Sequence, residues 1–193
     1  MVSRSGEVDE RPHLWVGPNY GQDASVRLLV LALPRVMGRD DLRHIGVGLE
    51  ARSTGAYVAG TLKHLQFTAV ARLVLGRAAP REECEDFWRR VAFLDDTSAI
   101  PAHLETLQPD ALLALGAEAW AALPPGESDS ADASGTAPSP SEPWGAQRRL
   151  RHAGGTCRAT CTPHPASNGF AFREHTAIVR ALVEPEAGRR ATF

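Results

Sequence analysis

The sequence lacks three features that would each define a class of protein. It has three cysteines in 193 residues, and so small and odd a number gives no disulfide framework. It contains no run of the roughly 20 apolar residues that a membrane-spanning helix needs. Its first twelve residues are polar and lack the apolar core of a signal peptide. We therefore expect a cytoplasmic protein that makes no membrane contact.

The composition is otherwise that of a globular protein. Hydrophobic residues make up 43% of the chain and charged residues 23%, both close to the globular average. A chain of this length can bury one sizeable core, so we expect residues 1–193 to form a single domain. Residues 124–143 contain no large apolar side chain and cannot bury enough surface to offset their ordering entropy. We predict a mobile internal loop there.

Lysine is nearly absent, since Lys63 is the one lysine among 21 basic residues. The net charge is only −2, but residues 144–193 carry eight arginines against three acidic residues. Arg148, Arg149 and Arg151 form the densest basic cluster. Arginine forks suit phosphate groups, so this cluster is a candidate phosphate-binding site. A solvated flank of the internal loop is the alternative interpretation.

Short apolar runs alternate with helical patterns along the chain. Four runs have the composition of buried strands: Val26–Leu33, Val91–Leu94, Ala111–Leu115 and Thr156–Thr160. The predicted helices are Gly55–Gly76, Arg81–Arg90, Ala102–Gln108, Ala117–Leu123 and Arg173–Glu184. Because such alternation implies a parallel sheet with helices on both faces, we predict an α/β fold. It is a three-layer αβα sandwich with a four-stranded parallel sheet.

Two of the segments that follow predicted strands carry candidate catalytic residues. Ligands of open parallel sheets bind at the carboxyl ends of the strands. His164 lies there between two prolines, which stiffen its backbone, and suits stabilisation of a developing oxyanion; a solvated surface turn is the alternative. Asp95 and Asp96 end another strand, where a binding site or the N-cap of a helix over Thr97–Leu107 would account for them.

A metal centre is not expected from the cysteines. Cys157 and Cys161 lie near His164, but their spacing does not match that of a zinc knuckle. We predict ordinary buried thiols and no metal or organic cofactor.

Taken together, these segments resemble the uracil-DNA glycosylase superfamily. The sequence from His164 to Asn168 resembles its His-Pro-Ser loop after the last strand, and Asp95 stands where its middle strand often ends in a base-reading Asn. The run LQPDALLALGAEAWAAL is similar to its third strand and following helix. WVGPNYG followed by RLLVLAL resembles the opening of a small bacterial branch. The resemblance spans about residues 13–183 and implies a DNA glycosylase that flips a base out of the stack.

The sequence departs from the family pattern at two positions. The loop after the first strand reads Leu33-Pro34-Arg35-Val36, where the family has a polar residue that positions the attacking water; Asn19, Asp40 or Asp41 could replace it. The base-reading Asn is an Asp, in a register that leaves Asp95 and Asp96 as alternatives. A carboxylate only accepts hydrogen bonds, so it would accept from the N4 amine of cytosine and repel the O4 of uracil.

The resemblance and these departures define the expected function. We expect a monomer that binds DNA and removes a bulky modified cytosine, such as those of some phage DNA, in phage defence. His164 would stabilise the leaving base, Asp95 would read it, and the expected substrate contacts are Asn19, Tyr20, Arg35, Asp96, Ser167, Asn168 and Phe170. The alternatives are a uracil glycosylase of base-excision repair, a catalytically dead DNA-binding protein and an N-glycosidase acting on free nucleotides.

Overall fold

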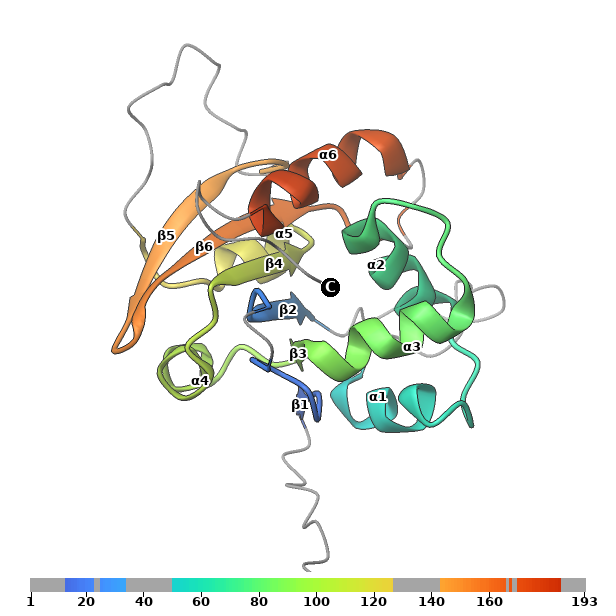
Figure 1. Ribbon diagram of the computed structural model, residues 1–193. Coiled ribbons are helices and arrows are strands. Elements are labelled where there is room, and N and C mark those ends of the chain that lie inside the picture. Colours follow the sequence, from blue (N-terminus) through green and yellow to red (C-terminus); the bar gives the residue numbers. More distant parts are fainter. Residues whose placement is uncertain are drawn as a thin grey trace, which may run out of the picture.

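The computed structural model describes residues 13–22, 25–33, 50–126, 143–165, 167 and 170–184 (Figure 1). Helices and strands alternate through most of this part of the chain, which confirms the predicted α/β class. The elements, in chain order, are β1 (Leu14–Val16), β2 (Leu28–Ala32), α1 (Ala51–Val58), α2 (Leu65–Leu75), α3 (Arg81–Arg90), β3 (Ala92–Leu94), α4 (Ile100–Leu107), β4 (Ala111–Leu115), α5 (Ala117–Ala121), β5 (Gln147–His152), β6 (Gly155–Thr162) and α6 (Phe172–Val183).

The sheet is mixed and has six strands in the order β1-β3-β2-β4-β6-β5. The four strands predicted from apolar runs form its centre and are parallel to one another. The prediction of a four-stranded, purely parallel sheet is wrong, because β1 and β5 add antiparallel edges. These strands escaped prediction for physical reasons: β1 has three residues, and β5 is an edge strand in which only Leu150 and His152 are buried.

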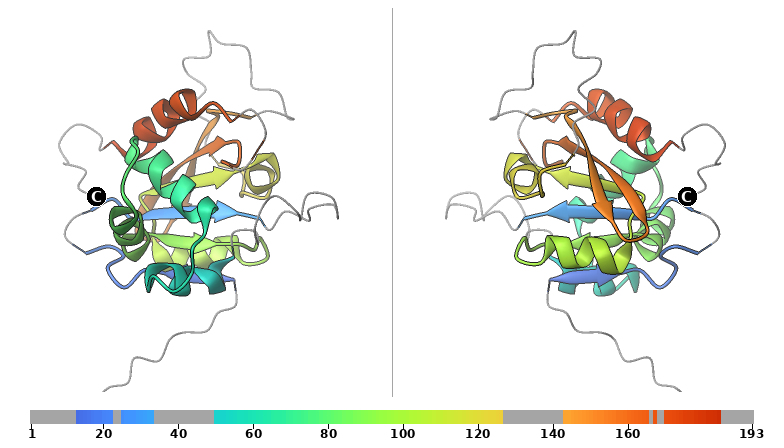
Figure 2. Two further views of the ribbon diagram at one scale, coloured as in Figure 1. Left: turned by 90° about the vertical axis from the view of Figure 1, so that its right-hand side faces the viewer. Right: turned by 90° about the vertical axis from the view of Figure 1, so that its left-hand side faces the viewer.

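Helices cover both faces of the sheet (Figure 2). One face packs against α1, α2, α3 and α6, and the buried aromatic residues Tyr57, Phe67, Trp88 and Phe93 gather there. Their rings meet mostly edge to face, as in the Phe67–Trp88 pair, whose centroids lie 5.0 Å apart, an arrangement that aromatic rings favour. The other face packs against α4 and α5. Both faces of β2 and β4 are therefore buried, which explains their unbroken apolar sequences.

The single helix predicted over Gly55–Gly76 is two helices, and that prediction is wrong. The chain leaves α1 through Gly60, whose φ of 75° lies in the left-handed region that glycine adopts without a steric cost. The side chain of Arg81 donates hydrogen bonds to the carbonyl oxygens of Gly60 at 3.1 Å and Leu62 at 3.3 Å. These bonds satisfy carbonyl groups that the interrupted helix leaves without partners.

The internal loop predicted over residues 124–143 falls mostly on residues 127–142, which lie outside the described part of the chain. None of the helices in the described ranges is long and apolar enough to cross a membrane.

Candidate functional site at the carboxyl edge of the sheet

The carboxyl ends of the four parallel strands lie at one edge of the sheet. Leu31 pairs with Leu94, Ala32 with Leu115, and Leu115 with Thr162, so the strands end level with one another. Asp95 follows β3, and His164 follows β6 after one proline. β2 and β4 separate β3 from β6, which places these two ends about 14 Å apart at ordinary strand spacing. Both sequence-predicted catalytic residues therefore lie at the edge where open α/β sheets bind ligands.

The carboxylate of Asp95 is buried and has two partners within the protein. Its Oδ1 lies 2.8 Å from Nδ1 of His13, and its Oδ2 accepts a hydrogen bond of 2.7 Å from the backbone N–H of Ala51. The pairing of Leu14 with Leu94 places His13 beside Asp95, and the Asp95 N–H donates to the His13 carbonyl oxygen at 3.1 Å. Strand pairing thus holds the histidine against the carboxylate.

Asp95 also acts as the N-terminal cap of α1. The residue at the N-cap position, Glu50, makes no side-chain capping bond, and the first N–H groups of a helix have no partner within it. The Asp95 carboxylate supplies one acceptor and places a negative charge at the positive end of the helix dipole. Its side chain is 4% exposed, so its described contacts are with the protein. Direct reading of a base by Asp95 stays a prediction.

Asp96 stabilises the turn that leads into α4. Its Oδ1 accepts hydrogen bonds from the backbone N–H groups of Thr97 at 2.7 Å and Ser98 at 3.2 Å, and its Oδ2 accepts from the Ser98 hydroxyl. The Ser98 hydroxyl is the main reason that the pKa of Asp96 is lowered. The alternative of an N-cap for a helix from Thr97 is wrong, because α4 begins at Ile100. Of the two acids, Asp95 is the buried one at the sheet edge.

His164 is 7% exposed, so the alternative of a solvated surface turn is wrong. Its carbonyl oxygen accepts a hydrogen bond of 2.8 Å from the N–H of Ser167, whose own carbonyl accepts one of 3.3 Å from Phe170. The Phe170 ring packs 4.8 Å from that of His175, next to the core. Backbone hydrogen bonds therefore link Ser167 to His164 and Phe170 to Ser167. Two predicted contacts, Arg35 and Asn168, lie outside the described residues.

Asn19 and Tyr20 do not belong to this edge, which corrects their assignment as substrate contacts. β1 runs antiparallel to β3, so the residues that follow β1 lie at the amino end of β3. The Asn19 N–H donates to the carbonyl oxygen of Arg89 at 2.8 Å, and the Tyr20 hydroxyl donates to that of Leu107 at 3.4 Å. Burial raises the pKa of Tyr20. Both residues pack the opposite edge of the sheet from His164.

The three arginines of β5 also lie away from His164. Arg149 pairs with Arg158, which pairs with the first residue of β4, Ala111. His164 is six residues further along from Arg158, or about 20 Å at the rise of a strand. The predicted arginine cluster is therefore near the amino edge and would contact a different stretch of a nucleic acid from the one at His164.

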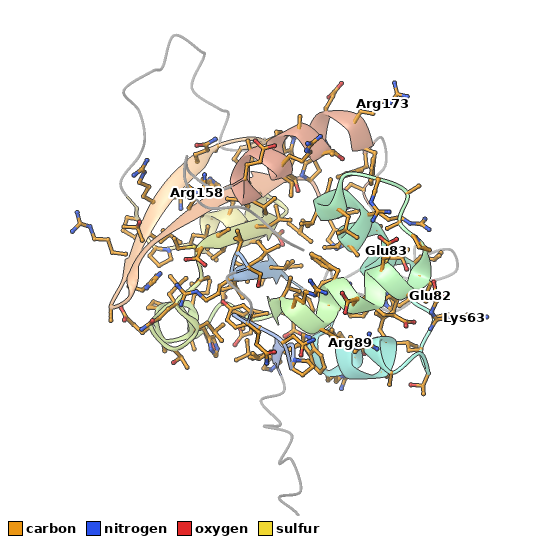
Figure 3. All side chains as sticks on the ribbon, in the orientation of Figure 1. Lys63, Glu82, Glu83, Arg89, Arg158 and Arg173 are labelled. Atoms are coloured by element: carbon orange, nitrogen blue, oxygen red, sulfur yellow. The ribbon has the colours of Figure 1, made fainter. Side chains whose placement is uncertain are left out.

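Arg148 has a structural role that the sequence did not predict. Its guanidinium lies 4.3 Å from the centre of the Trp120 ring, a cation–π distance. It also donates to the carbonyl oxygens of Trp120 and Leu123, each at 3.3 Å, at the end of α5. Arg158 does the same at the end of α6, where it donates to Leu182 and Glu184 at 2.7 Å (Figure 3). Both cations therefore satisfy the carbonyl groups at helix C-termini.

A groove of about 630 Å³ lies beside the remaining arginines. The apolar part of its wall comes from α4, from the two prolines after α5 and from Leu150. Arg149, Arg151 and Glu105 supply its charged groups. His164 and Asp95 do not line this groove, so the chemistry predicted at the carboxyl edge would not take place in it.

We expect Arg149 and Arg151 to contribute to DNA affinity without contributing to sequence preference. The double substitution Arg149→Gln/Arg151→Gln should weaken binding on every DNA and reduce the slope of log K against log salt by about 2, if each contacts one phosphate. The matched control Arg77→Gln/Arg90→Gln removes two arginines that form surface ion pairs with Glu83 and Asp86. They lie on the side of the sheet that α3 covers, opposite α4. An equal slope for the double variant and wild type would contradict phosphate contacts by these two residues.

The three cysteines are buried and unpaired. Burial raises the pKa of Cys157 and of Cys161 to about 12. Among the described residues no group of three His, Cys, Asp or Glu side chains could hold a metal ion.

These thiols should react slowly in the folded protein. At pH 8 a group with a pKa near 12 is almost wholly the thiol, whereas alkylation needs the thiolate. We expect intact mass spectrometry with iodoacetamide to show little labelling of the native protein and three labels after unfolding in urea. Rapid native labelling at Cys157 or Cys161 would show that the sheet opens there.

Compared with models of known protein families, the chain matches none. A search of curated proteins also gives no match.

Proposed function

We propose that the protein is a DNA glycosylase, which hydrolyses the N-glycosidic bond of a base flipped out of the DNA stack. One observation carries the proposal: a buried histidine fixed between two prolines shares the carboxyl edge of the parallel sheet with a buried acid. The resemblance of the sequence around His164 to the superfamily's His-Pro-Ser loop supports the same activity.

In the proposed reaction the sugar develops positive charge while the departing base takes up negative charge. His164 would donate a hydrogen bond to the O2 of the base and stabilise that charge. Its burial strengthens such a bond because the local dielectric is low. Asp95 lies at the other end of the site. Its negative charge would stabilise the positive charge that develops on the sugar.

For the base we propose a modified cytosine. The acceptor-only chemistry of a carboxylate fits an amine-bearing base, and the two protein bonds of Asp95 use two of its roughly four lone-pair sites. Unmodified cytosine is excluded as a target because its removal would destroy the host genome. A substituent on C5 is the difference that the site would have to recognise, which suits a role in defence against phages with modified DNA.

The proposal is tested by following the release of free base by mass spectrometry. The substrates are single- and double-stranded oligonucleotides with one glucosylated 5-hydroxymethylcytosine, and the corresponding free nucleotide. Release from the oligonucleotides, but not from the nucleotide, is the expected result. Release from the nucleotide alone would identify an N-glycosidase of nucleotides instead, and DNA binding without release would identify a catalytically dead DNA-binding protein.

A further inference from the structure

The glycosylase mechanism needs a group that activates the attacking water. The first residue after β2, Leu33, is apolar, and the candidates Asp40 and Asp41 lie outside the described residues. We propose that His13 is that group, acting as a general base oriented by Asp95; this inference rests on the proposed function. His13 precedes β1 and had no part in the chemistry expected from the sequence. It lies at the carboxyl edge because β1 pairs with β3 (Figure 1).

The contact with Asp95 selects the tautomer of neutral His13. A carboxylate cannot donate, so the 2.8 Å contact between Oδ1 and Nδ1 requires the proton on Nδ1. Whenever the imidazole is neutral, the other ring nitrogen, Nε2, carries the lone pair. Asp95 cannot swing away from His13 without giving up its 2.7 Å bond from the Ala51 N–H. The helix α1 therefore positions Asp95, and Asp95 positions the imidazole.

The solvent exposure of the two side chains indicates that Asp95 is the positioning residue and His13 the reacting one. The side chain of His13 is 58% exposed and that of Asp95 4%. A buried acid behind an accessible imidazole is the arrangement that lets histidine take a proton and then be stabilised as the cation. A purely structural cap for α1 needs the carboxylate alone and gives no reason for an ordered imidazole on its outer side.

The step balances without a cofactor. Water attacks C1′ of the sugar, and one of its protons passes to Nε2 of His13 as the new carbon–oxygen bond forms. The carbon–nitrogen bond breaks, and its electron pair leaves with the base. The imidazolium, paired with Asp95, then returns the proton to the departed base or to solvent. The products are an abasic sugar and a neutral free base, and the protein is regenerated.

The charged groups on the elements next to His13 are two acids and one ion pair. Asp95 and Asp96 lie on the β3 side, where Asp95 contacts the imidazole at 2.8 Å and Asp96 bonds to Ser98. Glu50 and Arg52 lie at the start of α1, where they pair at 2.6 Å, and Asp95 contributes to the raised pKa of Arg52. Acid should inhibit the reaction, because protonated His13 has no lone pair to accept a proton from water.

The test compares His13→Ala and His13→Gln with wild type on the glucosylated 5-hydroxymethylcytosine oligonucleotide. We expect kcat to fall by about 10²–10⁴-fold with KM little changed, and the acid limb of the pH–rate profile to disappear. Added imidazole should restore part of the activity of His13→Ala. The control His103→Ala replaces a histidine of α4. It should keep wild-type activity with or without added imidazole. Melting temperatures close to that of wild type would show that the variants are folded.

Each outcome decides the matter. If wild type releases base and the His13 variants keep its kcat and its acid limb, His13 is not the base, while the glycosylase activity stands. A parallel rise in KM with no imidazole rescue would assign His13 to substrate binding and overturn the inference. A wild-type protein that releases no base from any DNA overturns both proposals. Nitrogen NMR of the imidazole provides a check that needs no activity: a proton on Nε2 rather than Nδ1 at neutral pH would also contradict the inference.

Discussion

Replacing His164 with alanine should lower the rate of base release by about 100-fold or more, with little change in DNA affinity. The negative charge that His164 is proposed to stabilise builds up only as the glycosidic bond breaks, so its hydrogen bond belongs to the transition state. Single-turnover rates and equilibrium binding to the same oligonucleotide separate the two effects.

The control for this prediction is His175→Ala, which removes a second buried histidine near the same loop. It should affect stability through its packing against Phe170 and leave the rate constant of the folded protein near that of wild type. Equal losses of affinity and rate in His164→Ala would show that His164 supports the loop rather than the reaction.

Removing the Asp95 carboxylate should reduce both stability and activity, and two substitutions separate these effects. Asp95→Ala leaves the Ala51 N–H without its acceptor and the start of α1 without a negative charge, which should lower the free energy of unfolding by about 1–3 kcal/mol. Asp95→Asn retains an oxygen that can accept from Ala51 and should lose less. Urea unfolding at neutral pH measures both.

The activities of the two variants should not follow their stabilities. An amide NH₂ facing His13 would donate to Nδ1 and move the ring proton to Nε2, which removes the lone pair that the reaction needs. Asp95→Asn should therefore be nearly as inactive as Asp95→Ala while being more stable. If Asp95→Asn keeps wild-type turnover, the carboxylate is a helix cap and nothing more.

The central strands could be predicted from the sequence because burial on both faces leaves a local signature. β4 begins and ends where its apolar run does, and β2 falls within the predicted range. The break between α1 and α2 could not be predicted, because the apolar spacing continues across Gly60 while the bonds from Arg81 that stabilise the break come from another helix. The edge strand β5 could not be predicted because its three arginines conceal the alternation of the buried residues Leu150 and His152.

Of the residues at the site, His164 and Asp95 could be predicted from the sequence and the role of His13 could not. His164 and Asp95 follow apolar strands, and the rule that parallel strands end at a common edge was enough to place both there. The contact between His13 and Asp95 joins residues 82 positions apart, and the bond from Ala51 spans 44. No local pattern encodes either, since the first depends on β1 pairing with β3 and the second on the start of α1 lying beside the end of β3. The same pairing places Asn19 and Tyr20 at the opposite edge, a position that no local pattern predicts.

The most direct test of the account is a single panel of oligonucleotides incubated with the wild-type protein and treated with alkali to break the strand at abasic sites. The members are identical except for one base, which is cytosine, 5-hydroxymethylcytosine, its glucosylated form or uracil. The account predicts strand breaks at the modified cytosines, a much slower reaction at uracil and none at cytosine. Breaks at uracil alone would replace the proposed base with uracil, and the absence of breaks in every member would contradict the assignment of this protein as a DNA glycosylase.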